Sequence, residues 1–166
     1  MSTDTSFTID VNQLIHEIFG GNPHRNDLAI GLYNDTDASI KVDYYLEHGS
    51  IVDISKGNTV HSQSLWEIGA HAKGAGSNIT LNVTMPNGSG WAIMAATPSN
   101  KENYFKVHHN KNGYKDARVA HKAADKDGKH YSTKGIYDED HNGYNAVISI
   151  TGESPAACCI AFEKLD

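Results

Sequence analysis

The sequence contains little cysteine and few basic residues, and it has no long apolar run. Two cysteines occur among 166 residues, and they are adjacent, at Cys158 and Cys159. Neighbouring residues of a strand point to opposite faces of a sheet and cannot easily reach each other's sulfur. We therefore expect no disulfide between them and predict two buried thiols.

Basic residues are too scarce for a nucleic-acid-binding surface. The chain has 14 Lys and Arg against 20 Asp and Glu, which gives a formal net charge of -6. Binding to phosphate backbones needs concentrated Lys and Arg. We expect no nucleic-acid partner, and a neutral or zwitterionic partner suits the composition better.

No apolar stretch is long enough to cross a bilayer, and the first ten residues lack the positive start and apolar segment of a secretion signal. We expect a protein that is soluble as made. It either stays in the cytoplasm, is released by a non-classical route to act at target membranes, or has a leader that the sequence does not include. The length of 166 residues predicts a single domain over 1–166.

Motifs of catalysis and of zinc binding are missing from the sequence. There is no H-E-x-x-H or G-x-S-x-G, and His108 and His109 are neighbours that face opposite ways in a strand. We predict that the protein is not an enzyme and has no cofactor, apart from one calcium candidate described below.

The chain does contain many strand signals, most densely between Asn78 and Val107. Apolar and polar residues alternate from Ile79 to Met85, which predicts a half-buried strand with its polar face toward water. The apolar run from Trp91 to Ala96 predicts a strand covered on both faces. Pro98 ends that strand, and a third begins at Tyr104. We expect the turn between them to lie at one end of a sandwich.

Similar patterns over the rest of the chain predict a mainly β protein, a β-sandwich over 28–166 flanked by two short α-helices. Gly and Asn punctuate the strands at intervals typical of a sandwich. The further predicted strands lie at 28–32, 40–46, 51–54, 64–71, 129–137, 145–151 and 158–162, and the second helix lies at 115–124.

The N-terminal segment 1–21 contains an amphipathic helix. Asp10 is placed to cap it, Gln13 completes a capping box, and Ile9 and Leu14 have the spacing of a hydrophobic staple. Such a stripe either docks on the sandwich or enters a membrane, and periodicity does not separate the two. The apolar stripe consists of Val11, Leu14, Ile15, Ile18 and Phe19.

Several segments resemble those of the actinoporins, a family of pore-forming cytolysins. In that family the sandwich binds membrane through aromatic loops, and the N-terminal helix swings out to line an oligomeric pore. The resemblance implies a lipid partner and a possible homo-oligomer on membranes. The matching segments are LAIGLYNDT (28–36), GSGWAIMAATP (88–98), NYFKV (103–107), KDAR (115–118) and STKGIYDEDHNGYNAVISI (132–150).

The resemblance also places a membrane site in this chain. It implies that Pro98, Tyr104 and Phe105 contact the membrane, with Tyr114 and His121 near the lipid headgroup, while the stripe of the N-terminal helix inserts. The chain departs from the family pattern at two places. Ser99 to Glu102 replaces a loop dense with Tyr and Trp, and the second helix has alanines and His121 where the family offers tyrosines to phosphocholine.

The same fold also occurs in fungal fruit-body lectins, so glycan binding without pore formation is the alternative function. The aromatic candidates for a sugar site are Tyr114, Tyr131 and two tryptophans, Trp66 and Trp91. The competing interpretation is that both tryptophans belong to the core.

Two features stand apart from the resemblance. Asp138, Asp140 and Asn142 form D-x-D-x-N-G, the first half of a calcium loop, although Ser149 stands where the bidentate glutamate is expected. The alternative is an exposed acidic hairpin turn. Residues 153–166 add a strand beyond the family's usual end, which we expect to pin or replace an edge.

Overall fold

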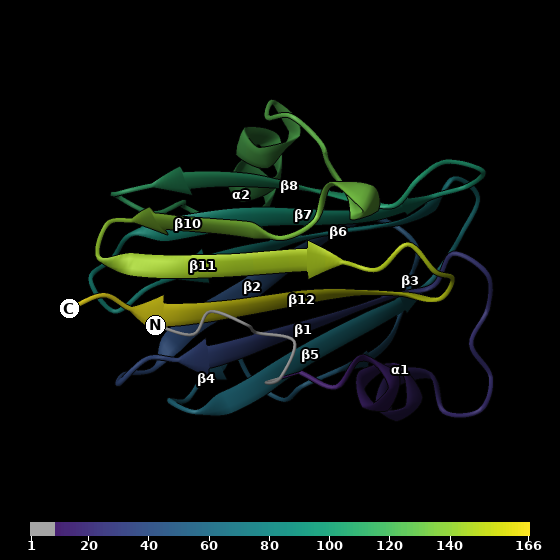
Figure 1. The fold of residues 1–166 in the computed structure, drawn as a ribbon, viewed down its shortest axis with the longest axis horizontal. Helices are drawn as coiled ribbons and strands as arrows, with labels where there is room; N and C mark the ends of the chain where they lie inside the picture. Colours follow the sequence, from purple (N-terminus) through teal and green to yellow (C-terminus); the bar gives the residue numbers. More distant parts are fainter. Residues whose placement is uncertain (1–8) are drawn as a thin grey trace.

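The computed structural model describes residues 9–166 as two facing six-stranded sheets with one helix on each outer surface (Figure 1). The mainly β, actinoporin-like sandwich expected from the sequence is confirmed. Sheet A has the order β10 (Tyr137–His141), β11 (Tyr144–Ile150), β12 (Ala156–Lys164), β1 (Leu28–Asp35), β5 (Ser64–His71) and β3 (Ser50–Ile54). Sheet B has the order β4 (Thr59–Val60), β2 (Ile40–His48), β6 (Gly76–Thr84), β7 (Gly90–Pro98), β8 (Tyr104–Asn110) and β9 (His130–Tyr131).

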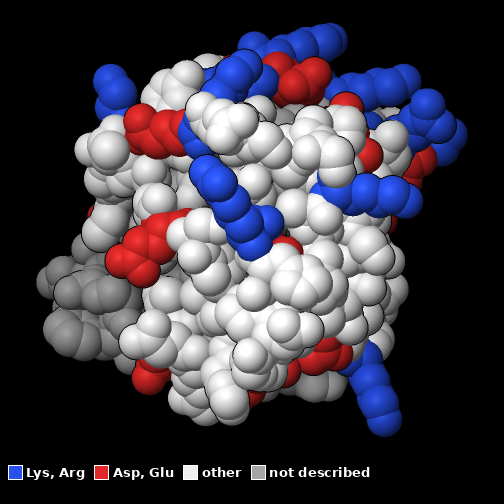
Figure 2. Space-filling model, turned by 90° about the vertical axis from the view of Figure 1, so that its right-hand side faces the viewer, with Lys and Arg blue, Asp and Glu red and all other residues white. Residues whose placement is uncertain are grey.

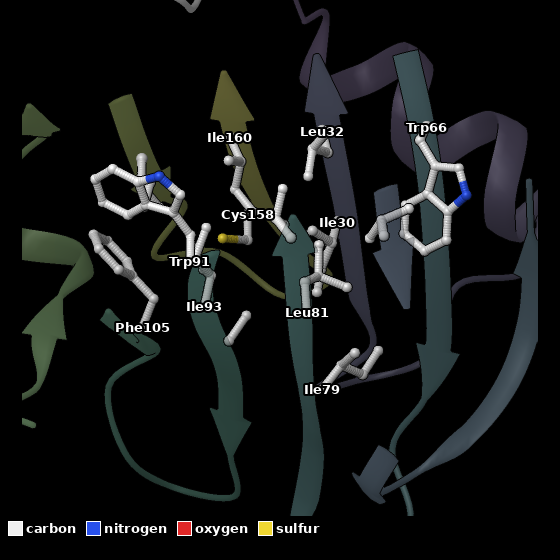
Figure 3. Packing of buried hydrophobic residues seen from close by; sticks show 14 of the residues in the cluster. Ile30, Leu32, Trp66, Ile79, Leu81, Trp91, Ile93, Phe105, Cys158 and Ile160 are labelled. Atoms are coloured by element: carbon white, nitrogen blue, oxygen red, sulfur yellow. The ribbon is translucent and has the colours of Figure 1, made fainter. Parts of the chain in front are cut away.

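The main core lies between the two sheets, where apolar side chains from both inner faces interdigitate (Figure 3). Trp91 is 1% exposed and Trp66 is 3% exposed, so both tryptophans are core residues and neither can stack on a sugar. Phe162 packs against the Trp91 ring with ring centroids 5.7 Å apart. The core interpretation of the tryptophans is therefore confirmed.

The last strand, β12, lies inside sheet A and not at its edge. It pairs with β1 in parallel and with β11 in antiparallel fashion. The prediction that residues 153–166 pin or replace an edge is therefore wrong, because the segment from Ala156 to Phe162 is apolar on both faces and is buried on both. Cys158 faces the core between the sheets, while Cys159 faces α1, and both are free thiols as predicted.

Strand β6 also differs from the prediction. Its polar residues do not face water, because α2 (Ala117–Asp125) lies over them on the outer surface of sheet B. Thr80 is fully buried and Asn82 is 5% exposed. Strand β7 is buried along both faces from Gly90 to Thr97, as expected from its apolar run.

The first helix, α1 (Val11–Phe19), lies on the outer surface of sheet A (Figure 1). The Asp10 carboxylate caps it by accepting from the Gln13 amide at 3.1 Å. The predicted capping box is only half present, because the Gln13 side chain donates to Glu17 within the helix. Ile9 and Leu14 belong to one apolar cluster, as the staple predicts. Neither helix in residues 9–166 has the length and apolar character needed to cross a bilayer.

Candidate functional site

One end of the sandwich is closed by four connections that are tied to one another by hydrogen bonds. The Asn26 amide donates to the Ser154 hydroxyl at 2.7 Å, and the Thr97 hydroxyl donates to the Asn26 carbonyl at 2.6 Å. The Asn103 side chain donates to the Thr151 carbonyl at 2.9 Å. We call this surface the loop end. Its connections are residues 20–27, 72–75, 99–103 and 151–155.

The loop end has an uneven distribution of charge, as Figure 2 shows. Lys and Arg side chains gather in the upper half, on the side of α2, while much of the lower half is formed by uncharged residues. Arg25, Lys73 and Lys101 are exposed on these connections. Asp and Glu side chains lie among the basic ones in the upper half, and Glu102 and Glu153 are exposed on the same connections. The upper half is therefore mixed in charge, whereas the lower half is largely uncharged.

A pocket of about 260 Å³ lies beside the loop end, next to the C-terminal end of α2. Strands β2, β6, β7 and β8 all contribute to it, so a rigid sheet positions most of its wall. We call it the headgroup pocket. Its lining residues are Glu47, His48, Ala75, Ser77, Asn78, Ala96, Pro98, Tyr104 and Asp125.

The headgroup pocket offers mainly hydrogen-bond acceptors. Asn78 is 9% exposed, and its buried side-chain oxygen has no hydrogen-bond partner in the described structure. A buried acceptor without a partner is costly. Glu47 and Asp125 add two carboxylates to the wall. The pocket therefore suits a ligand that carries hydroxyl or ammonium groups.

Neighbouring side chains hold the Glu47 and Asp125 carboxylates in place. His121 is 8% exposed, and it places Nδ1 2.7 Å from the Thr80 hydroxyl and Nε2 3.0 Å from a Glu47 carboxylate oxygen. The Lys106 ammonium donates to the backbone carbonyl of Asp125 at 2.9 Å and lies 3.2 Å from its carboxylate. These contacts fix the acceptors before any ligand arrives, which lowers the entropy cost of binding.

Tyr104 lies in the pocket wall, but one face of its ring is already used. The Lys129 ammonium sits 4.6 Å from the ring centroid, and the Tyr131 ring meets Tyr104 edge-on at 6.2 Å. Burial raises the pKa of the Tyr104 hydroxyl, so it remains a neutral hydrogen-bond donor. A cation of the protein itself therefore occupies one face of this ring.

The structure brings together some of the residues predicted from the sequence and separates others. Pro98 and Tyr104 line the headgroup pocket, and His121 holds Glu47 behind it. Tyr114 lies at the opposite end of sheet B, beside Gly90, where its hydroxyl is hydrogen-bonded to His108. It therefore does not share a site with Tyr104.

Phe105 requires a correction. Its side chain is fully buried and stacks on the His130 ring at 5.1 Å. The prediction that Phe105 contacts a membrane is wrong for this conformation, because alternate residues of β8 face opposite ways and Tyr104 takes the outer position.

The predicted insertion stripe is the docked face of α1. Leu14, Ile18 and Phe19 are buried against sheet A, while Val11 and Ile15 are half-buried at the margin. The sheet is shaped to receive the helix through two glycines. A Cβ added at Gly69 would lie 2.1 Å from Ile18, and one at Gly31 would lie 3.1 Å from Leu14. The helix therefore packs directly on the backbone of Gly31 and Gly69, which we call the seat of α1.

The acidic residues Asp138 and Asp140 lie in strand β10, directly before the turn of the β10–β11 hairpin. Asn142 and Gly143 both have positive φ, the geometry of a two-residue hairpin turn, and not that of a calcium loop between helices. Asp138 and Asp140 both accept from the Asn145 amide, at 2.7 and 2.8 Å. Calcium binding here stays a prediction.

Several residues of this region were not predicted from the sequence. Glu47, Asn78 and Asp125 join the pocket from three separate elements, and no local pattern links them. Ile136 is 59% exposed, the most exposed large apolar side chain of residues 9–166, and it directly precedes β10. The one sequence signal that could have identified Ile136 as an exposed apolar residue is its position after a glycine in a polar segment.

Comparison with known proteins supports the fold. No family model matches the chain, and no curated protein matches it by sequence. Among solved structures, the lipid-binding protein Nakanori superposes with a TM-score of 0.61 at 15% identity, over 93% of this chain and 76% of that one. The lectin XCL of Xerocomus chrysenteron gives 0.52 at 12% identity, over 82% and 99% of the two chains. The protein IP-1A of Alcaligenes faecalis gives 0.53 at 12% identity, over 84% and 91%.

These likenesses define the class of fold, an actinoporin-like β-sandwich that is shared by a lipid-binding protein and a fungal lectin. At 12–15% identity they establish the architecture alone. What this chain binds has to be argued from its own residues.

Proposed function

We propose that this protein binds membranes through its loop end, holds a lipid headgroup in the headgroup pocket, and releases α1 from sheet A into the lipid interface. It acts as a binding protein and not as an enzyme. The observation that carries the proposal is the seating of α1, where Leu14 and Ile18 rest on glycines of the sheet. Apolar contacts have no directional requirement, so lipid can replace the sheet at little net cost.

Pore formation by a homo-oligomer is the finer form of this proposal. The nine residues of α1 span about 14 Å by helical rise, which is under half of a hydrocarbon core of about 30 Å. A pore would therefore need residues 1–10 to extend the helix, and residues 1–8 lie outside the described part of the chain.

The test uses the margin of α1, where a change affects insertion more than docking. Val11 and Ile15 are half-buried in the docked state, whereas Asn12 is exposed. Ile15→Glu and Val11→Glu should each lower dye release from liposomes by tenfold or more, since each removes an apolar side chain worth more than about 1.4 kcal/mol in lipid. Asn12→Glu, the matched control, should leave release unchanged. Equal leakage from all four proteins would contradict the insertion of α1.

Glycan binding without helix release is the second candidate, and the chemistry of the headgroup pocket favours it. The pocket wall offers the carboxylates of Glu47 and Asp125, which suit the hydroxyls of a sugar. Lys129 already occupies one face of Tyr104, which disfavours a choline group there.

Two variants, Lys129→Ala and Glu47→Gln, separate the lipid ligand from the glycan ligand. Lys129→Ala frees the ring face of Tyr104, so it should strengthen binding to phosphatidylcholine vesicles if the pocket takes a quaternary ammonium. Binding on a glycan array that is weakened by Glu47→Gln, without leakage from any liposome, supports the lectin function. Tyr104→Ala should weaken either ligand.

A further inference from the structure

Apart from the headgroup pocket, the loop end contains a group of three side chains from two connected segments. Asp27 precedes β1, His71 ends β5, and His24 lies in the connection between α1 and β1. One ligand atom of each residue lies within 4.8 Å of the other two. No other group of three or more His, Cys, Asp or Glu in residues 9–166 meets this spacing.

Asp27 is the fixed member of the group. Its side chain is fully buried, and its carboxylate accepts from the Ala72 amide at 3.1 Å and from the His71 ring at 2.8 Å. Within residues 9–166 no Lys or Arg forms an ion pair with it. A buried carboxylate has to be hydrogen-bonded, and the His24 backbone amide donates to it in addition to the Ala72 amide and the His71 ring.

The two histidines complete a donor set that suits a metal ion. Their rings stack with centroids 4.2 Å apart, and His24 is exposed to solvent while the His71 side chain is 30% exposed. Two imidazoles and one carboxylate form a common ligand set for zinc and related divalent ions, with a water in the fourth position.

We propose that His24, Asp27 and His71 form a binding site for a divalent transition metal such as Zn²⁺. Metal to nitrogen distances of about 2.0–2.1 Å place tetrahedral ligand atoms about 3.3 Å apart, so the most distant pair of the group has to contract by about 1.5 Å at most. The 2.8 Å hydrogen bond between His71 and Asp27 has to open to admit the ion. His24 supplies this movement by turning out of the stack, because it is exposed on a connection and the other two residues are held by β1 and β5.

The site has a consequence for α1. The Phe19 ring at the end of α1 lies 5.6 Å from the His71 ring, and the connection that carries His24 is the one about which α1 would swing. A bound ion would tie that connection to the end of β5 and hold α1 in place. This consequence rests on the proposed function, whereas metal binding itself does not.

The experiment is a Co²⁺ titration of the full chain followed by its visible absorption, with Zn²⁺ as competitor. The wild type should show one tetrahedral Co²⁺ site that Zn²⁺ displaces. His24→Ala removes an exposed ring and should leave the fold intact while it lowers the affinity by 10-fold or more. His71→Ala should lower the affinity as much, but it also removes a hydrogen-bond partner of the buried Asp27 carboxylate, so its folding is checked by circular dichroism. His61→Ala, which removes an exposed histidine that is not part of this group, is the matched control and should bind as the wild type does.

The melting temperature gives a second measurement on the same proteins. Zn²⁺ should raise it for the wild type and for His61→Ala, and should raise it less for His24→Ala at the same Zn²⁺ concentration. Unchanged Co²⁺ affinity in His24→Ala and His71→Ala, or an absence of tetrahedral Co²⁺ absorption in the wild type, would overturn the site. Neither measurement uses liposomes, so the metal site and the membrane function are tested independently of each other.

Discussion

The two helices cover corresponding faces of the two sheets, but different chemistry holds each of them. Beneath α1 the contacts are apolar, with Leu14 and Ile18 seated on glycines of sheet A. Beneath α2 small alanines pack on Met94, and His121 forms a buried polar link to Thr80 and Glu47. Lipid can replace apolar contacts, whereas it offers no substitute for a buried hydrogen-bonded network. The comparison therefore identifies α1 as the element suited to leave and α2 as the one that stays.

The largest expected effect on this comparison comes from the seat of α1. Gly69→Ala places a Cβ 2.1 Å from Ile18 and should lower the free energy of unfolding by about 3 kcal/mol. It should also speed dye release from liposomes, since it favours the undocked helix. Urea denaturation measures the first effect. The double variant Gly69→Ala/Ile18→Ala should lose less than the sum of its single variants, and additive losses would contradict the steric explanation.

Gly31→Ala is the graded control for the same seat. Its Cβ would lie 3.1 Å from the flexible end of Leu14, which can yield by a few tenths of an ångström. We expect a loss of about 1 kcal/mol or less. A loss as large as that of Gly69→Ala would show that glycine at these positions matters for the strands and not for the helix.

The polar link beneath α2 should have the next largest effect. His121→Ala leaves the fully buried Thr80 hydroxyl without a partner and should cost about 2 kcal/mol in urea unfolding. A double-mutant cycle with Thr80→Ala should show a coupling energy of about 1 kcal/mol. Dye release should not become faster, because the contacts of α1 are unchanged. Faster release would contradict the proposal that only α1 leaves its sheet.

The two N-caps offer a smaller and closely matched pair. Asp10 accepts from the Gln13 amide at 3.1 Å and Asp116 from the Val119 amide at 2.9 Å. Asp10→Ala and Asp116→Ala should each cost about 1 kcal/mol in thermal or urea unfolding. We expect only Asp10→Ala to alter dye release. An equal change with Asp116→Ala would mean that release follows overall stability.

The smallest expected effect is a pH dependence beneath α1. Burial, and after it the Glu17 carboxylate, raises the pKa of Glu67, whose buried carboxylate oxygen has no hydrogen-bond partner in the described structure. The folded state therefore holds this proton more tightly than the unfolded state. Stability from this group is present below its ordinary pKa of 4.5 and is lost as the pH rises through the raised value. The urea concentration at the unfolding midpoint should fall more between pH 4 and 7 for the wild type than for Glu67→Gln. An equal fall in both proteins would refute the role of Glu67.

The local elements could be predicted because their patterns depend on neighbouring residues. The cap at Asp10 and the apolar stripe of α1 follow from helical periodicity. The burial of β7 follows from its unbroken apolar run. Strand β6 was misjudged, because its alternation indicates one polar face and cannot show that α2 returns to cover Thr80 and Asn82.

The pairing of distant segments could not be predicted. The residues 156–162 are apolar on both faces, which indicates a doubly buried strand, but they do not identify β1 as its parallel partner, since only tertiary contacts decide strand order. The headgroup pocket could not be predicted from the sequence for the same reason. Asn78 and Asp125 are brought together by sheet register and the end of α2, and the position of Lys129 over Tyr104 depends on a turn after that helix.

The two cysteines allow the most direct test of α1 release. Cys159 faces α1, and burial raises the pKa of its thiol to about 11, while Cys158 faces the core between the sheets. Thiol labelling of each cysteine, followed by mass spectrometry with and without liposomes, reports on the two sides of β12 in one molecule. We predict that liposomes accelerate the labelling of Cys159 and leave Cys158 protected. Unchanged labelling of Cys159 on membrane-bound protein, or equal labelling of both thiols, would contradict the release of α1.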